Sequence, residues 1–383
     1  MKLIYCIPHL YNAGGMERVL TEKVNYLAAK GYEVTVVTTE LTPSGCRDAY
    51  FRLSDKVRVI PLRIDFDADY RLPLITKFLC HCRKMRLYRH KLERLLIEEQ
   101  ADVCISLCGK EIAFLGALRV PCRTMVEVHF AIDQRTQLLT ATHQGRIWRW
   151  LGNIRTWQLV RDVRRLDRFI VLTQHDRSDW EKAGCKNVVC IPNPSSICPK
   201  TSGEHGLNQV LAVGRLHPQK GFTRLIEAWQ LVHRECPEWN LKIVGEGEER
   251  PLLEASVRQH GLEQWVSLPG LSDDIASDYL NSALLMQSSR YEGLPLVLIE
   301  GMSCGLPCVA FDCPKGPKEL IVNGENGLLV PEGDIKALAA AAIRLLKETD
   351  TRKRMGLYAY RYAQQHFALE PIMQQWITLF NVV

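Results

Sequence analysis

Two glutamates in the stretch RYEGLPLVLIE, Arg290 to Glu300, carry the first chemical signal of this sequence. Gly293 suits a tight turn and Pro295 suits the first position of a helix, so we expect Glu292 just before a helix and Glu300 about a turn and a half inside it. A helix N-terminus presents free N–H groups and partial positive charge, which favour phosphate. Carboxylates accept hydrogen bonds from diols, so the stretch predicts a site for a diphosphate flanked by hydroxyl-bearing groups.

A second stretch, VGRLHPQKGF, supplies cations for such a ligand. Arg215 and Lys220 follow a predicted strand, and Gly221 opens the next helix. The guanidinium can grip a diphosphate with its planar fork, while the ammonium adds a point charge. The alternative is a pair of solvated surface cations.

Three further stretches place functional residue types after predicted strands. In YNAGGMERVL, Gly14 and Gly15 allow a ligand to approach the backbone at a helix start, although an ordinary tight turn would also need them. VEVHF ends on His129, which could contact a sugar hydroxyl or move a proton, or could be structural. FDCPKGPKEL brings Lys315 and Lys318 to a cationic loop. No stretch has the G-x-G-x-x-G spacing, so a nicotinamide or flavin cofactor has little support.

The elements that must position these residues alternate between short β-branched runs and helical patterns, which indicates an α/β fold built from parallel β-α-β units. In the first half we expect strands at Leu3–Ile7, Glu33–Thr38, Val57–Pro61, Val103–Leu107, Arg123–Val128, Phe169–Leu172 and Val188–Ile191. In the second half we expect them at Val210–Val213, Leu241–Val244, Val266–Leu268, Leu284–Gln287, Pro307–Ala310 and Gly327–Val330. Each half then forms a doubly wound sheet, and two such domains facing each other create a cleft lined by the loops after the strands.

Domain limits follow from composition. Pro, Ser and Gly accumulate between Ile191 and Gln209, which indicates a linker. We therefore expect an N-terminal domain over residues 1–195 and a C-terminal domain over residues 205–365. A last helical pattern, from about Tyr358 to Phe380, is too apolar for a free tail, so residues 366–383 should pack back towards the N-terminal domain.

Charge and cysteine usage narrow the class of protein. Residues 1–200 carry 32 Lys plus Arg against 21 Asp plus Glu, whereas the rest of the chain is mildly acidic. A basic lobe can face nucleic acid, an anionic substrate or a membrane, but no nucleic-acid-binding motif accompanies the charge.

The spacing of the 14 cysteines matches no zinc site, so reduced thiols are expected and no metal is predicted. No long apolar run or signal peptide is apparent, which predicts a cytoplasmic protein.

Taken together, GGMERV, VGRLHPQKG, RYEGLPLVLIE, FDCPKGPKEL and NGENGLLV resemble, in order and across nearly the whole chain, the family 4 retaining glycosyltransferases of GT-B architecture. The resemblance is closest to bacterial enzymes that extend lipid-linked or surface polysaccharides, including N-acetylgalactosaminyltransferases. It implies an N-terminal acceptor-side domain and a C-terminal nucleotide-sugar domain. The segment FAIDQRTQLL after the cleft histidine matches no acceptor pattern.

The resemblance also implies roles for single residues. Glu300 would bind the ribose diol and Glu292 the donor sugar, while Arg215 and Lys220 would hold the diphosphate without a metal ion. The implied catalytic and donor-binding residues are Glu292, His129, Arg215, Lys220, Gly14, Gly15, Gly293, Leu294 and Glu300. UDP is preferred over GDP on the resemblance alone. A nucleotide-sugar epimerase and a non-catalytic nucleotide-sugar-binding scaffold remain as alternatives.

Two basic stretches predict where the protein works. KFLCHCRKMRLYRHKLER, from Lys77, has seven Lys or Arg and two His against one acid, with aliphatic and aromatic residues interleaved. RIWRWLGNIRTWQLVRDVRR, from Arg146, adds Trp148, Trp150 and Trp157. Helices of this composition lie on anionic membranes, although each could instead be a solvated face with its apolar stripe in the core. We therefore expect peripheral binding to the cytoplasmic face of the membrane, where a lipid-linked acceptor would be presented.

Overall fold

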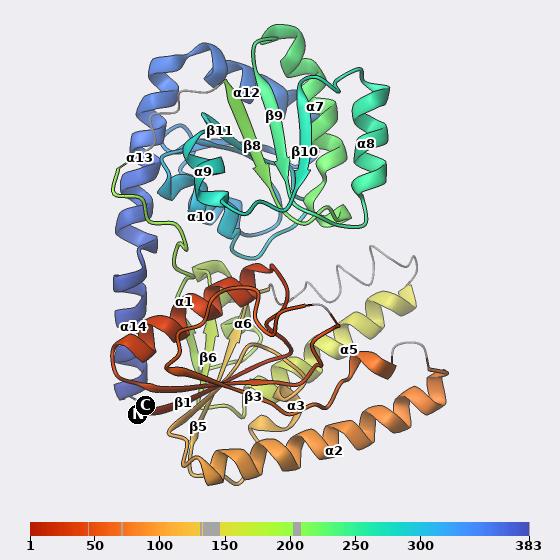
Figure 1. Cartoon of the computed structure of the whole chain (residues 1–383), viewed down its shortest axis with the longest axis vertical. Helices are drawn as coiled ribbons and strands as arrows, with labels where there is room; N and C mark the ends of the chain where they lie inside the picture. The colour runs from red at the N-terminus through yellow and green to blue at the C-terminus, as the bar shows by residue number, and fades with distance from the viewer. Residues whose placement is uncertain (45, 70–71, 131, 133–145, 202–207, 383) are drawn as a thin grey trace. The chain divides into compact units, whose positions relative to one another are not determined.

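The computed structural model describes residues 1–383 except 45, 70–71, 131, 133–145, 202–207 and 383. The chain forms two compact units (Figure 1). The N-terminal unit consists of Met1–Pro192 together with Met373–Val383, and the C-terminal unit of Asn193–Ile372. All 14 cysteines are free thiols.

A parallel sheet of seven strands forms the described centre of the N-terminal unit, in the order β3-β2-β1-β4-β5-β6-β7. Its strands are β1 (Lys2–Ile7), β2 (Glu33–Thr38), β3 (Val57–Pro61), β4 (Val103–Ser106), β5 (Arg123–Val128), β6 (Arg168–Val171) and β7 (Val188–Cys190). The helices are α1 (Gly15–Ala29), α2 (Leu74–Glu98), α3 (Ile112–Leu115), α5 (Arg146–Val163), α6 (Gln174–Lys182) and the short η1 (Asp67–Asp69). The strand order reverses at β1, so the sheet is doubly wound.

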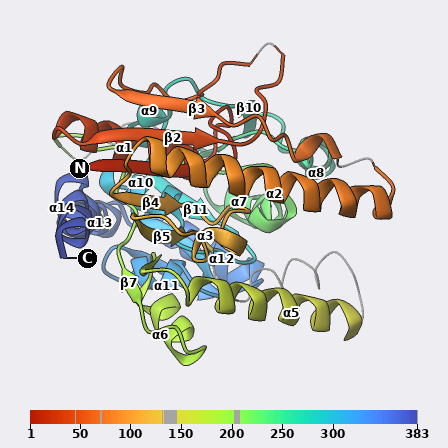
Figure 2. The same ribbon diagram turned by 90° about the horizontal axis from the view of Figure 1, so that it is seen from below.

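Helices α2, α3 and α5 contribute to one hydrophobic core on the N-terminal sheet. Figures 1 and 2 show α3 between α2 and α5 on this face. Because each helix follows a strand and runs back along the sheet, α2 and α5 begin at the edge where the strands end. Their first turns therefore lie on the side of the unit that carries the loops expected to bind ligands.

A parallel sheet of six strands, in the order β10-β9-β8-β11-β12-β13, forms the described centre of the C-terminal unit. The strands are β8 (Gln209–Val213), β9 (Asn240–Val244), β10 (Val266–Gly270), β11 (Leu284–Gln287), β12 (Cys308–Asp312) and β13 (Gly327–Pro331). The helices are η2 (Pro218–Lys220), α7 (Phe222–Glu235), α8 (Arg250–Gln259), α9 (Ile275–Leu280), α10 (Leu296–Ser303), α11 (Pro317–Leu320), α12 (Ile335–Lys347) and α13 (Thr349–Phe367). Helix α14 (Leu369–Val382) returns to the N-terminal unit.

The predicted α/β class with two doubly wound sheets is confirmed, and every predicted strand is found within one or two residues of its expected ends. Two local predictions were wrong. Pro295 is the residue before α10, with an extended backbone, and not the first residue of the helix. The last helical pattern is two helices, because Ala368 has an extended conformation between α13 and α14.

Candidate functional site

The turn before α10 brings a cation and a carboxylate together in the C-terminal unit. Lys220, at the end of η2, places its Nζ 2.6 Å from Glu292 Oε1. The same oxygen accepts hydrogen bonds from Ser289 Oγ at 2.6 Å and from Gln287 Nε2 at 3.1 Å. The Glu292 side chain is largely buried. These three contacts hold the carboxylate in one orientation beside the start of α10.

Glu300, the fifth residue of α10, is anchored through both of its oxygens. Ser196 Oγ donates to Oε1 at 2.5 Å, and Tyr279 Oη donates to Oε2 at 2.9 Å. The residue is 5 % exposed. A carboxylate has about four lone-pair positions and accepts hydrogen bonds only. Sequence reasoning missed Ser196 and Tyr279, which come from the linker and from α9.

Two glycines allow the loops around this pair to approach each other closely. Gly221 has a φ of +62°, and a Cβ at this position would lie 2.4 Å from the carbonyl oxygen of Ser288. Gly316 has a φ of +77°, and its Cβ would lie 2.3 Å from the carbonyl oxygen of Gly293. The loop after β12 therefore packs against the turn before α10.

Arg215 follows β8 and is exposed. Within the described ranges no hydrogen bond or ion pair engages its guanidinium. The pKa of His217 is lowered, first by burial and then by the positive charge of Arg215. Leu294, by contrast, is largely buried. In those same ranges no three His, Cys, Asp or Glu side chains gather where they could hold a metal ion.

A buried polar network lies behind His129 in the N-terminal unit. Glu127 Oε1 is 3.2 Å from His129 Nε2, and both Glu127 oxygens accept from Lys23 Nζ, at 2.5 and 2.6 Å. The side chains of Lys23 and Glu127 are each 1 % exposed. Burial raises the pKa of Glu127, but Lys23 and then His129 outweigh burial and lower it to about 2. Burial lowers the pKa of Lys23 against the attraction of Glu127.

Gly14 and Gly15 lie at the start of α1, as their pattern predicted. A Cβ on Gly14 would lie 2.2 Å from Glu17 Oε2, so this glycine makes room for a carboxylate of its own helix. Glu17 Oε1 is also 3.3 Å from His9 Nδ1. The negative charge of Glu17 in the first turn of α1 interacts favourably with the positive end of the helix dipole. The sequence patterns did not indicate this contact.

The loop between β4 and α3 carries a further buried acid. Glu111 accepts hydrogen bonds from Ser106 Oγ at 2.5 Å and from Tyr88 Oη at 3.1 Å, and burial raises its pKa. At the same edge of the sheet, a cavity of about 190 Å³ is lined by Phe66, Asp67, Asp69, Lys77, His81 and Lys110. Both features lie where doubly wound sheets bind ligands.

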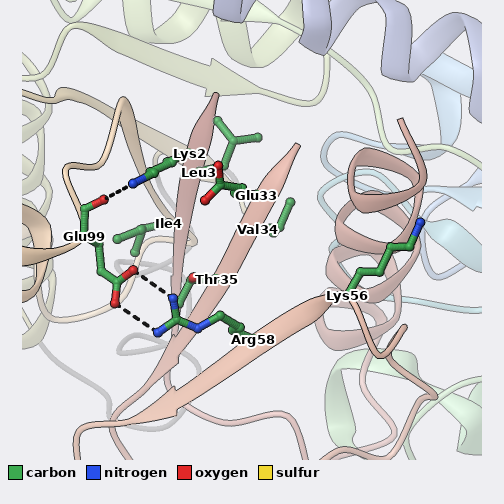
Figure 3. A pocket seen from close by; sticks show the side chains of 9 residues that line it. All are labelled: Lys2, Leu3, Ile4, Glu33, Val34, Thr35, Lys56, Arg58 and Glu99. Atoms are coloured by element: carbon green, nitrogen blue, oxygen red, sulfur yellow. Dashed lines mark hydrogen bonds and ion pairs between the residues drawn. The ribbon is translucent and has the colours of Figure 1, made fainter. Parts of the chain in front are cut away.

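A second cavity, of about 100 Å³, lies at the opposite edge, where β1, β2 and β3 begin (Figure 3). Arg58 and Glu99 form a two-pronged ion pair across it, at 2.9 and 3.0 Å. Ligands of such sheets bind beyond the ends of the strands and not at their beginnings. We therefore place the candidate site at the other edge. Most of the segment FAIDQRTQLL after His129, namely residues 131 and 133–139, lies outside the described residues.

Comparisons with known proteins identify related sequences. A family model described as Glycosyltransferase Family 4 matches residues 13–195, and one described as Glycosyl transferases group 1 matches residues 199–362. An uncharacterized glycosyltransferase of Haemophilus influenzae is 28 % identical over 98 % of both chains. The amylovoran biosynthesis glycosyltransferase AmsD of Erwinia amylovora is 28 % identical over 99 % of both chains.

A third relative, from Campylobacter jejuni, is named GalNAc-alpha-(1->4)-GalNAc-alpha-(1->3)-diNAcBac-PP-undecaprenol alpha-1,4-N-acetyl-D-galactosaminyltransferase. It is 26 % identical over 100 % of this chain and 99 % of its own.

Solved structures show the same fold. A complex of S. aureus TarM with fondaparinux, alpha-GlcNAc-glycerol and UDP has a TM-score of 0.80 at 16 % identity and covers 99 % of both chains. Anabaena HepE in complex with UDP and glucose has a TM-score of 0.74 at 19 % identity over the whole of both chains. The two family models together span most of the sequence, and both units have the doubly wound sheets of the GT-B fold. The chain therefore belongs to the family 4 glycosyltransferases of GT-B architecture.

Proposed function

We propose that this protein is a retaining, metal-independent glycosyltransferase that moves a hexose or N-acetylhexosamine from a nucleotide sugar, preferably a UDP-sugar, to a lipid-linked or surface-polysaccharide acceptor. The observation that carries the proposal is the Lys220–Glu292 pair before α10, with Glu300 anchored inside that helix. Glu300 binds the ribose diol and Glu292 faces the donor sugar. Lys220 and Arg215 bind the diphosphate, because an ammonium retains further N–H groups after one contact with a carboxylate.

The remaining candidate residues complete this site. Gly293 and Leu294 lead into α10, whose free N–H groups face the diphosphate. Gly14 and Gly15 bind the phosphates, and His129 contacts the transferring sugar. Proposed catalytic roles fall on Glu292, His129, Arg215 and Lys220.

Charge development explains the proposed mechanism. Cleavage of the bond between sugar and phosphate leaves negative charge on the diphosphate and cationic character on the sugar ring. Two cations and a helix start stabilise that leaving group, so a metal ion is not required. The acceptor hydroxyl attacks the face from which the diphosphate departs, and a leaving-group oxygen takes its proton, which retains the anomeric configuration.

Two relatives support the proposed acceptor class. The Erwinia relative is named for biosynthesis of the polysaccharide amylovoran, and the Campylobacter relative for an acceptor on undecaprenol diphosphate. UDP in the TarM and HepE structures supports the proposed preference for a UDP-sugar.

A nucleotide-sugar screen tests the proposal. A ligand at a hundred times its dissociation constant adds about 2.7 kcal/mol to stability, so the correct donor should raise the melting temperature clearly. That donor should then be consumed only with a lipid-linked or polysaccharide acceptor, and the product should retain the anomeric configuration. Free epimerised donor without acceptor would identify an epimerase, and binding without turnover on any acceptor would identify a scaffold.

The two glutamates should respond differently to neutralisation. Glu300→Gln should weaken binding of the free nucleoside diphosphate, because the ribose contact exists with or without the sugar. Glu292→Gln should leave that affinity nearly unchanged and lower sugar transfer. Calorimetric titration with UDP and steady-state kinetics measure the two effects, and equal losses of UDP affinity in both variants would contradict the assignment.

Metal removal provides a separate test. We expect turnover to survive EDTA, because Lys220, Arg215 and the start of α10 already face the diphosphate in the proposed site. Rates are compared before chelation, after chelation and after addition of Mg²⁺ or Mn²⁺. A rate that falls with EDTA and returns with either cation would show that the metal-free assignment is wrong.

We further propose that the N-terminal unit docks on the cytoplasmic face of the membrane. Ile75, Phe78 and Leu79, in the first turns of α2, are 79, 65 and 62 % exposed, and Trp150 and Trp157 of α5 are each 62 % exposed. Both helices start where the strands of the sheet end (Figure 2). Such side chains suit the membrane interface, and neighbouring cations suit anionic lipid. None of the described helices has the length and apolarity needed to span a bilayer.

Flotation with vesicles tests the docking surface. The protein should rise with anionic vesicles at low salt, stay behind with neutral ones, and lose most binding when Ile75, Phe78 and Leu79 become Ser. Replacing the exposed Arg83 and Arg86 with Ser should weaken binding by about 1 kcal/mol per charge.

A matched control changes Leu252 and Leu271 of the C-terminal unit to Ser, since each is 53 % exposed. That variant should float like the wild type. The proposed docking surface would be wrong if the protein floated equally with anionic and neutral vesicles and if the α2 substitutions did not change its flotation.

A further inference from the structure

Gln287 is the last residue of β11, and its side chain is buried in the C-terminal unit. The strand order of this sheet reverses between β8 and β11, which is where doubly wound sheets bind ligands. Nε2 of the Gln287 amide lies 3.1 Å from Glu292 Oε1. Its Oε1 is buried and has no hydrogen-bond partner within the described ranges. A buried carbonyl oxygen without a partner destabilises a fold, so stability alone does not explain a glutamine here.

We propose that Gln287 is a positioning residue, which orients Glu292 so that Oε2 of this carboxylate faces the donor sugar. The inference rests on the proposed function, in which Glu292 contacts that sugar. A carboxylate oxygen accepts hydrogen bonds, so the NH₂ group of Gln287 faces Glu292 and the carbonyl group points away. Because Gln287 belongs to a strand, its hydrogen bond fixes the carboxylate to a rigid part of the unit.

The three side chains that donate to Glu292 all contact the same oxygen. Lys220 Nζ and Ser289 Oγ each lie 2.6 Å from Oε1, and Gln287 Nε2 is the third donor. One carboxylate oxygen has about two lone pairs, so Oε1 has no capacity for a further donor. In the part of the chain that the structure describes, Oε2 accepts no hydrogen bond, and it is not among the fully buried atoms without a partner. Oε2 is therefore the oxygen that a ligand can contact.

The chemistry of Oε2 limits what the ligand presents to it. A carboxylate oxygen accepts hydrogen bonds only, so the group opposite it is a donor, such as a sugar hydroxyl or an acetamido N–H. A donor analogue without that group would leave a polar atom of the site unpaired, which lowers its rate of transfer. Gln287 thus contributes to donor specificity without touching the ligand, because it determines which oxygen of Glu292 faces the sugar.

Gln287→Met tests the positioning role. The change removes the amide donor and the unpartnered oxygen together and retains the length of the side chain. The melting temperature should therefore stay within about 2 °C of the wild type. We expect kcat to fall about tenfold, because a small displacement of a reacting group is costly, while the Kd for UDP stays unchanged. Added to Glu292→Gln, the substitution should cause little further loss, because it acts through that carboxylate.

Two further variants separate the donor from the shape and from burial in general. Gln287→Glu keeps the shape but replaces the N–H donor with an acceptor, so it should be at least as impaired as Gln287→Met. Gln209, at the start of β8, donates to Ser282 Oγ at 3.0 Å at the opposite edge of the same sheet. Gln209→Met should leave kcat unchanged.

Specificity provides a readout that a purely structural role would not change. Among monodeoxy analogues of the donor, the wild type should discriminate strongly against the one that lacks the group opposite Oε2. Gln287→Met should discriminate about tenfold less, because Glu292 no longer holds its orientation. Equal discrimination in the two proteins would overturn the inference, as would a wild-type kcat in Gln287→Met. A melting temperature lowered by more than about 5 °C would identify Gln287 as a structural residue instead.

Crystal structures of the wild type and of Gln287→Met need no turnover and make the test independent of the proposed function. In the wild type, Glu292 should have one orientation with Oε1 beside Gln287 Nε2. In the variant, the carboxylate should turn or occupy two orientations. An unchanged Glu292 in the variant would overturn the positioning role even if the protein is an active transferase. A turned Glu292, together with absence of transfer by the wild type from every donor, would count against the proposed function alone.

Discussion

Replacing Lys220 with alanine is expected to lower turnover by about a hundredfold or more, which is the usual loss when one fixed group that stabilises a developing charge is removed. Its ammonium lies 2.6 Å from Glu292 Oε1 and helps to orient that carboxylate. In the proposed site the same ammonium also binds the diphosphate. Ser289 and Gln287 continue to hold Glu292, which should keep the variant folded. Initial rates at saturating donor measure the effect.

Two comparisons make the Lys220 result specific. Lys220→Arg retains the charge in a different shape and should be less impaired than Lys220→Ala. Lys336→Ala removes an exposed cation of α12 and should be indistinguishable from the wild type. Full activity of Lys220→Ala would remove this cation from the mechanism.

The second large effect concerns stability. Lys23→Met alone should destabilise the N-terminal unit by about 3–5 kcal/mol, because it leaves Glu127 as an uncompensated buried charge. For a unit of this size we expect the melting temperature to fall by roughly 6–20 °C. Adding Glu127→Leu should restore most of the loss. Calorimetry measures the melting temperature of both variants. If Lys23→Met alone is as stable as the wild type, the pair is not buried as described.

Acid should reduce the contribution of the same pair. A carboxyl group whose pKa is lowered by folding adds stability above its unfolded pKa, and the stability is lost as the pH falls through the folded value, here about 2 for Glu127. Denaturant unfolding between about pH 5 and about pH 2 should therefore show the wild type losing stability relative to Lys23→Met/Glu127→Leu. A pH-independent difference would argue against a depressed pKa.

Local patterns were enough to predict the sheets. Parallel strands with both faces covered are nearly continuous apolar runs, such as LIYCI in β1 and LLMQ in β11, and they contrast with the helices between them. The loops after those strands could then be located by counting. This is why Lys220 and Glu292, 72 residues apart, could both be named before their contact was known.

The partners of these residues could not be predicted in the same way. Nothing near Ser196 or Tyr279 in the sequence indicates a contact with Glu300, because that contact depends on how the linker and α9 fold over α10. Lys23 is harder still, since a lysine on an amphipathic helix is normally solvated. Only the fold shows that Glu127 and Trp376 surround it.

The return of α14 to the N-terminal unit has a consequence for the order of events during synthesis. The ribosome completes residues 1–192 first, yet Trp376 emerges only after the whole of Asn193–Ile372, about 180 residues later. At translation rates of about 5–20 residues per second, roughly 10–40 s pass before the Trp376 ring can cover the Lys23 ammonium. The C-terminal unit is contiguous in sequence and can finish folding first, so the first half of this protein to be made is the last to be completed.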